Sequence, residues 1–142
     1  MRERTMSSYA LAVALLVWLL APITLAQARG QYARGVYNPD TEVTVSGIVV
    51  SVVKIRRGNR SGGTHLNLKT SDATIDVRLG PSNFIEKQAF AISEGDQMEV
   101  TGSKVKVGEG EVLIAREIGK GDKTLTLRDS RGKPVWSGVQ RY

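Results

Sequence analysis

His65 is the only histidine in the chain, and imidazole is the side chain best suited to proton exchange near neutral pH. A nucleophilic site would need a serine or threonine beside this base and a carboxylate to orient it. The residues expected beside His65 are instead Asn67, Lys69 and Arg78, which do not make a catalytic triad. A metal site would have to be completed by groups such as Asp76, so we predict a hydrogen-bonding surface histidine and no metal site.

Other catalytic chemistry has little support. The carboxylates that could act as acid–base pairs fall at loop and strand-edge positions, where solvated charges are usual: Glu94, Asp96, Glu99, Glu109 and Glu111. The chain contains no cysteine, which excludes a disulfide, a thiolate metal site, a cysteine nucleophile and a lipid-bearing cysteine. We therefore expect no enzyme and no cofactor, with a hydrolase or metal-dependent activity at His65 and Asp76 as an alternative.

Binding chemistry is better represented, because one short stretch carries four basic residues: Lys54, Arg56, Arg57 and Arg60. Guanidinium groups hold phosphate or carboxylate oxygens bidentately, and the glycines at 58, 62 and 63 would let backbone N–H groups approach an anion. The formal net charge of +6 at pH 7 also favours anionic partners, although such a charge can serve solubility alone.

The elements that position these residues are predicted to be strands. The run EVTVSGIVVSVVKIRR, residues 42–57, is rich in valine and isoleucine and predicts one long strand that bends near Gly47. The glycine- and arginine-rich segment 57–63 has no apolar residue and predicts an exposed loop. The basic residues would therefore lie at the end of the first strand and in the loop that follows it.

Two further segments, THLNLKT and ATIDVRL, alternate apolar and polar residues and predict a β-hairpin with its turn at Ser71-Asp72. A two-residue turn determines which residues are cross-strand partners: Leu68 with Ile75, Leu66 with Val77, Asn67 with Asp76, and His65 with Arg78. Apolar residues then meet apolar residues on one face, and the polar residues share the other.

A short helix is expected after this hairpin, because Gly80-Pro81 ends the strand and Asn83 with Glu86 matches a capping box. The helix would cover residues 83–91. We expect three further strands, at 97–107, 111–118 and 124–127. A turn at 129–132 and a short return to Trp136 follow, and we expect Trp136 to pack on the barrel that the strands form.

This order of elements predicts an all-β protein, a five-stranded OB-fold Greek-key barrel with a short helix between strands three and four and a C-terminal hairpin extension. The expected boundaries are a secretory signal peptide at 1–28, a linker at 29–40, the OB-fold domain at 41–120 and a packed tail at 121–142.

The signal peptide is indicated by Arg2 and Arg4, an apolar run over 10–21, and an A-x-A cleavage pattern that ends at Ala28. Cleavage after Ala28 would make the protein periplasmic or secreted. An uncleaved membrane anchor is the alternative, because residues 9–26 carry no charge.

The spacing of VTVSGIV, LNLKTSDATIDVRL, EGDQMEVTGSKV and VLIAREI resembles the BOF family of bacterial exported OB-fold proteins over residues 42–118. The shared positions are structural: Gly47, Gly95-Asp96 and Gly102. The resemblance implies a periplasmic, non-enzymatic, stress-linked binding protein.

The predicted function is therefore an exported, non-enzymatic binding module for an anionic ligand or an envelope protein. Its binding surface would combine the loop with the outward polar face: Lys54, Arg56, Arg57, Arg60, His65, Asn67, Lys69, Asp76 and Arg78. One alternative is an interaction subunit that docks through an exposed tail around Val135 and Trp136. Single-stranded nucleic acid is disfavoured, because the polar face has no aromatic residue on which bases could stack.

Overall fold

The computed structural model describes residues 36–138, which belong to the second of two compact units, Tyr32–Tyr142. The predicted signal peptide and most of the predicted linker lie outside the described residues. Within residues 36–138, no helix is long and apolar enough to span a membrane.

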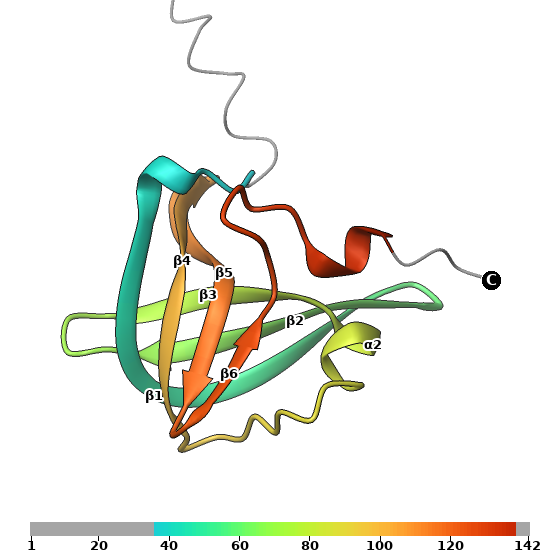
Figure 1. The fold of residues 1–142 in the computed structure, drawn as a ribbon. Helices are drawn as coiled ribbons and strands as arrows, with labels where there is room; N and C mark the ends of the chain where they lie inside the picture. The colour runs from blue at the N-terminus through green and yellow to red at the C-terminus, as the bar shows by residue number, and fades with distance from the viewer. Residues whose placement is uncertain (1–35, 139–142) are drawn as a thin grey trace, which may run out of the picture. The chain divides into compact units, whose positions relative to one another are not determined.

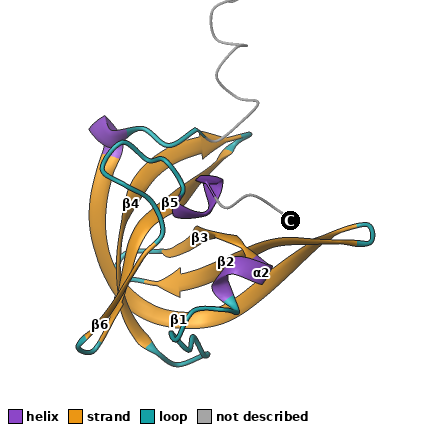
Figure 2. Cartoon of the chain, turned by 45° about the vertical axis from the view of Figure 1, so that its right-hand side comes forward, coloured by secondary structure: helices purple, strands orange, loops and turns teal. Residues whose placement is uncertain are grey.

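Six strands make up one sheet and give an all-β domain (Figures 1 and 2). The strands are β1 (Glu42–Arg57), β2 (Arg60–Lys69), β3 (Thr74–Pro81), β4 (Gln97–Val107), β5 (Gly110–Lys120) and β6 (Lys123–Thr126). Helical structure is limited to short turns: η3 (Pro39–Thr41), α2 (Ser82–Ile85) and η4 (Val135–Gly138). The sheet order is β3-β2-β1-β4-β5-β6, and an additional parallel pairing of β3 with β5 closes the first five strands into a ring.

Strand β1 is long because it pairs with one strand along its first half and with another along its second half. It pairs with β4 over Glu42–Ile48 and with β2 over Ile48–Arg57, so it passes from one part of the ring to the other. The predicted bend near Gly47 is confirmed by this change of partner. A Cβ at Gly47 would lie 2.4 Å from the carbonyl oxygen of Lys69, so only glycine allows the backbones to approach this closely.

The predicted hairpin is confirmed in full. Strands β2 and β3 pair through the four predicted residue pairs, from His65 with Arg78 to Leu68 with Ile75. Leu66, Leu68 and Val77 are completely buried. Because side chains alternate along a strand, the polar residues between them point away from the core.

The loop predicted for residues 57–63 is wrong. Strand β2 begins at Arg60, and only Gly58 and Asn59 form the turn. Gly58 adopts a φ of 58°, which suits a tight turn. Gly62 lies inside the strand, where a Cβ would stand 1.8 Å from the carbonyl oxygen of Ile55. The glycine at 62 therefore permits a close backbone approach at a register shift where β2 carries one extra residue, rather than an open loop.

The predicted helix over 83–91 is also corrected, because α2 contains only Ser82–Ile85. It begins after Pro81, and no side chain caps it. The hydroxyl of Ser82 is buried and accepts a hydrogen bond of 2.9 Å from Thr64 on β2, which holds the first turn against the sheet. The chain then leaves the helix and places Phe90 in the core.

Side chains from all strands of the ring, together with α2 and the segment after it, build the core. Its completely buried members include Leu66, Leu79, Val100, Leu113 and Ile118. Trp136 packs against this core, as predicted, and its ring centroid lies 5.1 Å from that of Phe84. The C-terminal segment is thus part of the packed domain.

Candidate binding surface

The outward face of β2 and β3 brings together the polar residues that the hairpin register predicted. His65 Nδ1 lies 3.3 Å from Asp76 Oδ1, and Arg78 Nε lies 3.8 Å from Asp76 Oδ2. Asn67 donates a hydrogen bond of 2.8 Å to the hydroxyl of Ser51 on β1. Asp76 therefore faces two basic groups at once, although Arg78 Nε is buried and has no hydrogen-bond partner among the described residues.

His65 is held in its neutral form by its surroundings. Burial lowers the pKa of His65 below its usual 6.5, and this effect outweighs the attraction of Asp76, which raises the pKa. At neutral pH the ring is therefore a hydrogen-bonding group and not a cation. Arg78 and Lys69 contribute positive charge to this face.

The predicted basic residues lie along the end of the β1–β2 hairpin, from Lys54 to Gly62, which we call the hairpin tip. Lys54 Nζ forms an ion pair of 2.6 Å with Glu86 Oε1, just after α2. Arg56 is exposed. Arg57 and Arg60 are partners in the backbone register on either side of the turn. Glu86 thus pairs with Lys54, and Arg56 forms no ion pair among the described residues.

A shallow pocket of about 340 Å³ opens between the hairpin tip and α2. Its wall includes charged side chains, two residues of the turn and one glycine of β2: Lys54, Arg56 and Glu86, Gly58 and Asn59, and Gly62. An anion site at this segment stays a prediction.

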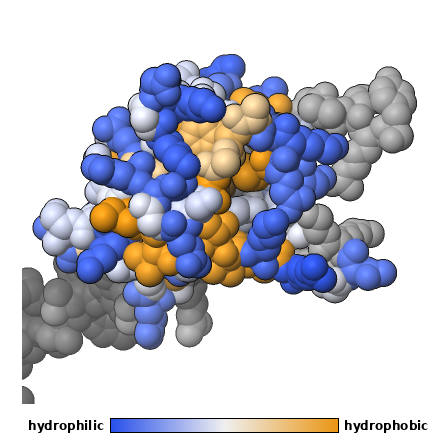
Figure 3. All heavy atoms as spheres, turned by 90° about the horizontal axis from the view of Figure 1, so that it is seen from below, coloured by the Kyte–Doolittle hydropathy of each residue, from blue (hydrophilic) through white to orange (hydrophobic). Residues whose placement is uncertain are grey.

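A row of exposed aliphatic side chains runs along β1 and was not anticipated from the sequence. Ile48, Val50, Val53 and Ile55 are each 40 to 52 % exposed. Figure 3 shows hydrophobic atoms gathered among polar ones on the face seen from below. The available signal was the consecutive apolar residues at 48–50 and 52–53, because a strand with one solvated face normally alternates.

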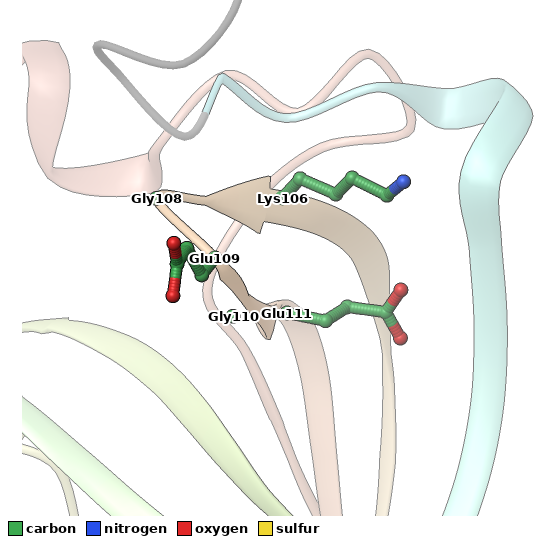
Figure 4. A pocket seen from close by; sticks show the side chains of 5 residues that line it. All are labelled: Lys106, Gly108, Glu109, Gly110 and Glu111. Atoms are coloured by element: carbon green, nitrogen blue, oxygen red, sulfur yellow. The ribbon is translucent and has the colours of Figure 1, made fainter.

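A second open hollow, of about 610 Å³, lies at the β4–β5 turn. Lys106 and Glu111 are partners in the register, and Figure 4 shows their side chains extending to the same side while Glu109 extends to the other. Glu111 also lies 3.2 Å from Lys104. Opposite charges that neutralise one another in solvent favour a solvated turn over a ligand site.

The two C-terminal residues predicted for partner binding, Val135 and Trp136, differ in their exposure to solvent. Trp136 is only partly accessible, because its ring packs on Phe84 and beneath the guanidinium of Arg128. Trp136 is therefore not the exposed aromatic residue that docking through the tail would require. Val135 is 44 % exposed and remains available to solvent.

A polar cluster at the start of the domain was missed because Tyr37 falls within the predicted linker. Glu42 accepts hydrogen bonds of 2.9 Å from both Nε and Nη2 of Arg116, and it also accepts one from the Tyr37 hydroxyl. Burial raises the pKa of Tyr37 to about 12, while the hydrogen bonds from Arg116 lower the pKa of Glu42. The cluster ties the residues before β1 to β5.

Across residues 36–138, no three histidine, aspartate or glutamate side chains gather as metal ligands would. The polar groupings that the structure does form are hydrogen-bonded pairs and small clusters, as at Asp76 and Glu42. Among the described residues, the features suited to recognition are therefore the hairpin tip and the aliphatic row of β1.

Comparison with known proteins identifies the family of this chain. No curated protein matches the sequence. The model of the MamS/MamX magnetosome protein family matches residues 41–125, a span that includes strands β1 to β5 and the hairpin tip. The resemblance to the BOF family that the sequence predicts finds no support in this match. Because the match covers more than half of the chain, the protein belongs to the MamS/MamX magnetosome protein family.

Proposed function

We propose that this chain is an exported, non-enzymatic binding module of the magnetosome, built on an OB-fold, which holds an anionic group of its ligand at the hairpin tip. The assignment to the magnetosome rests on the family. The ligand chemistry rests on the hairpin tip and its pocket.

The OB-fold is supported by the order of neighbours around the ring. Strand β1 lies between β2 and β4, and β3 meets β5 in parallel, so five strands close on themselves. The short helix α2 follows β3 and precedes β4. OB-folds bind ligands on the outward face of strands two and three and in the adjoining loops, which here include the hairpin tip.

The observation that carries the proposal is a polar pocket at a turn flanked by basic residues. Lys54 and Arg56 line the pocket, and the backbones of Arg57 and Arg60 are register partners at the turn. Figure 1 shows the β1–β2 hairpin extending away from the rest of the sheet as an arm. A projecting arm with concentrated positive charge can reach a phosphate- or carboxylate-bearing ligand without rearrangement of the core.

Nucleic acid fits this surface less well. The described aromatic residues Phe84, Phe90 and Trp136 pack in or against the core, and Tyr37 is hydrogen-bonded to Glu42. The outward face of β2 and β3 therefore presents no ring on which bases could stack. We expect weaker binding to single-stranded DNA than to a sulfated or phosphorylated polymer of equal charge.

The test uses protein purified from bacterial cells that express the full chain, with its mass measured to find where the leader is cut. Binding to heparin, single-stranded DNA and anionic vesicles is measured across a salt series. The tip variant changes Arg56, Arg57 and Arg60 to serine. A matched control changes three exposed lysines elsewhere to serine, Lys106, Lys123 and Lys133, and so removes the same charge.

Binding of the anionic probe should weaken as salt rises, and the tip variant should lose most of it while the control variant keeps it. Equal loss in both variants would reduce the effect to net charge and would contradict a site at the hairpin tip. No binding to any of the three probes would contradict the anionic ligand itself.

A further inference from the structure

We propose that β1 has a second binding role: its edge from Val50 to Ile55 receives an extended segment of a partner protein, in which aliphatic residues alternate with acidic ones. This surface overlaps the hairpin tip at Lys54 and Ile55 and shares Arg56 with the anion site proposed there, but its binding rests on the strand edge and its aliphatic side chains.

The second half of β1 has a backbone partner on one side only. From Ile48 to Arg57 it pairs with β2, whereas its pairing with β4 ends at Ile48. On that other side, the last backbone hydrogen bonds are those of Val49 with Asp96 and Gly95, at 2.9 and 2.8 Å. No strand within residues 36–138 continues the ladder past this point. Such an edge is a template for the backbone of another chain.

Two irregularities limit the length of this edge. The pairing of β1 with β2 shifts register between Val49 and Ser51 and again between Lys54 and Arg56. Ser51 to Lys54 lie between the shifts and keep regular pairing, whereas Val50 and Ile55 lie at the shifts themselves. Because bulges twist a strand and interrupt pairing, the segment that can accept a new strand is a short one. We therefore expect the partner to contribute a few residues, in the way that short peptides add to sheet edges.

The exposed side chains along this edge indicate which apolar residues the partner segment should carry. Val50, Val53 and Ile55 are 49, 43 and 40 % exposed, and Ile48 extends the row at 52 %. Lys54, on the opposite face, is already engaged by Glu86. An added strand would place alternate side chains beside the exposed row, where aliphatic residues would remove it from water.

The charged residues near the ends of this row indicate which polar residues the partner segment should carry. Arg56 lies beyond one end, and Lys69 is the register partner of Ile48 at the other. Both are exposed, and neither forms an ion pair with a described carboxylate. Acidic residues in the partner would complement Arg56 at the edge itself, while Lys69 lies one strand away on β2. A second copy of this chain fits less well, because it would bring a further excess of positive charge to the same edge.

The probe for this proposal is a capped synthetic heptapeptide in which glutamate alternates with valine and isoleucine. Two control peptides carry lysine in place of glutamate, or N-methyl groups on alternate backbone nitrogens. Affinity is measured by fluorescence anisotropy, and hydrogen exchange of the protein reports which amides gain protection. We expect protection within residues 50–55 and binding at least about tenfold weaker for either control peptide.

The protein variants are chosen so that folding is not at risk. Val50 and Val53 are both changed to serine, which leaves the charge unchanged. Changing Val135, an equally exposed valine, to serine provides the control. The double variant should lose about tenfold in peptide affinity and the Val135 variant should lose little. Heparin binding should be the same in both, because neither change touches the cations of the hairpin tip.

Several results would overturn the proposal. Equal affinity of the two variants for the peptide, or protection confined to another strand, would remove the edge of β1 as the site. Undiminished binding of the N-methylated peptide would exclude strand pairing. Dimerisation of the protein that the double variant abolishes would identify a second copy as the occupant. Absence of heparin binding by the unaltered protein, with intact peptide binding, would contradict only the anion site and would leave the edge of β1 as a binding site.

Discussion

The guanidinium of Arg128 lies 5.0 Å from the centre of the Trp136 ring, and the same side chain joins two strands of the sheet. Its Nη1 donates hydrogen bonds to the carbonyl oxygens of Leu79 on β3, at 3.0 Å, and Ala115 on β5. The parallel pairing of these strands ends one residue earlier, at Arg78 with Ile114. Arg128 therefore continues the contact between β3 and β5 where the backbone ladder stops.

Replacing Arg128 with methionine should destabilise the domain. Arg128 is 9 % exposed, so its removal leaves two carbonyl groups without their donor in a site with little access to water. We expect the free energy of unfolding to fall by about 2 to 4 kcal/mol, measured by urea denaturation. The change of Arg131, an exposed arginine nearby, to methionine should alter it by less than about 0.5 kcal/mol. Equal effects would show that Arg128 does not join the strands.

Gly80 and Trp136 are predicted to be coupled. A Cβ at Gly80 would lie 2.5 Å from Cη2 of the Trp136 indole, so the ring must move when alanine stands there. We expect Gly80→Ala to cost about 1 to 3 kcal/mol in urea denaturation and to change the tryptophan fluorescence. In a Trp136→Leu background the same change should cost clearly less, because the clash is absent. Additive effects would contradict the contact.

The pH dependence of stability should report on His65. Burial lowers the pKa of His65 in the folded protein, whereas the unfolded chain takes up its proton near pH 6.5. The unfolded state then binds more protons, so the free energy of unfolding falls as the pH drops from 6.5 toward the folded pKa. His65→Gln should make this slope shallower. The single histidine permits a direct check by NMR, and a folded pKa above 6.5 would refute the expectation.

Tyr37 should ionise later than an ordinary tyrosine. Its pKa is raised to about 12, first by burial and then by its hydrogen bond to Glu42. An ultraviolet absorbance titration of the native protein should contain one component near pH 12 that is missing in Tyr37→Phe. Glu42→Gln should move that component to lower pH, because the nearby negative charge is removed. If all tyrosines ionise near pH 10, the N-terminal segment does not pack as described.

The strands and the register of one hairpin followed from the sequence alone. The bounds of β1 and β4 agree with the apolar runs, and the pairing of His65 with Arg78 follows from alternation combined with a two-residue turn. These are local properties, because side chains alternate with a period of two and a turn of given length leaves one register that pairs apolar with apolar residues. Polar residues such as Asn67 and Asp76 could therefore be placed on one outward face before the structure was known.

Only the tertiary structure decided what those residues and their neighbours do. Gly62 lies in a strand and not in a loop, because the backbone of Ile55 packs closely against it. The helix α2 is short, because the chain after it places Phe90 in the core. The exposed edge of β1 and the burial of Arg128 depend on which strands meet across the ring. Such contacts join residues far apart in the chain, and no local period records them, because the free energy that determines them comes from packing between distant segments.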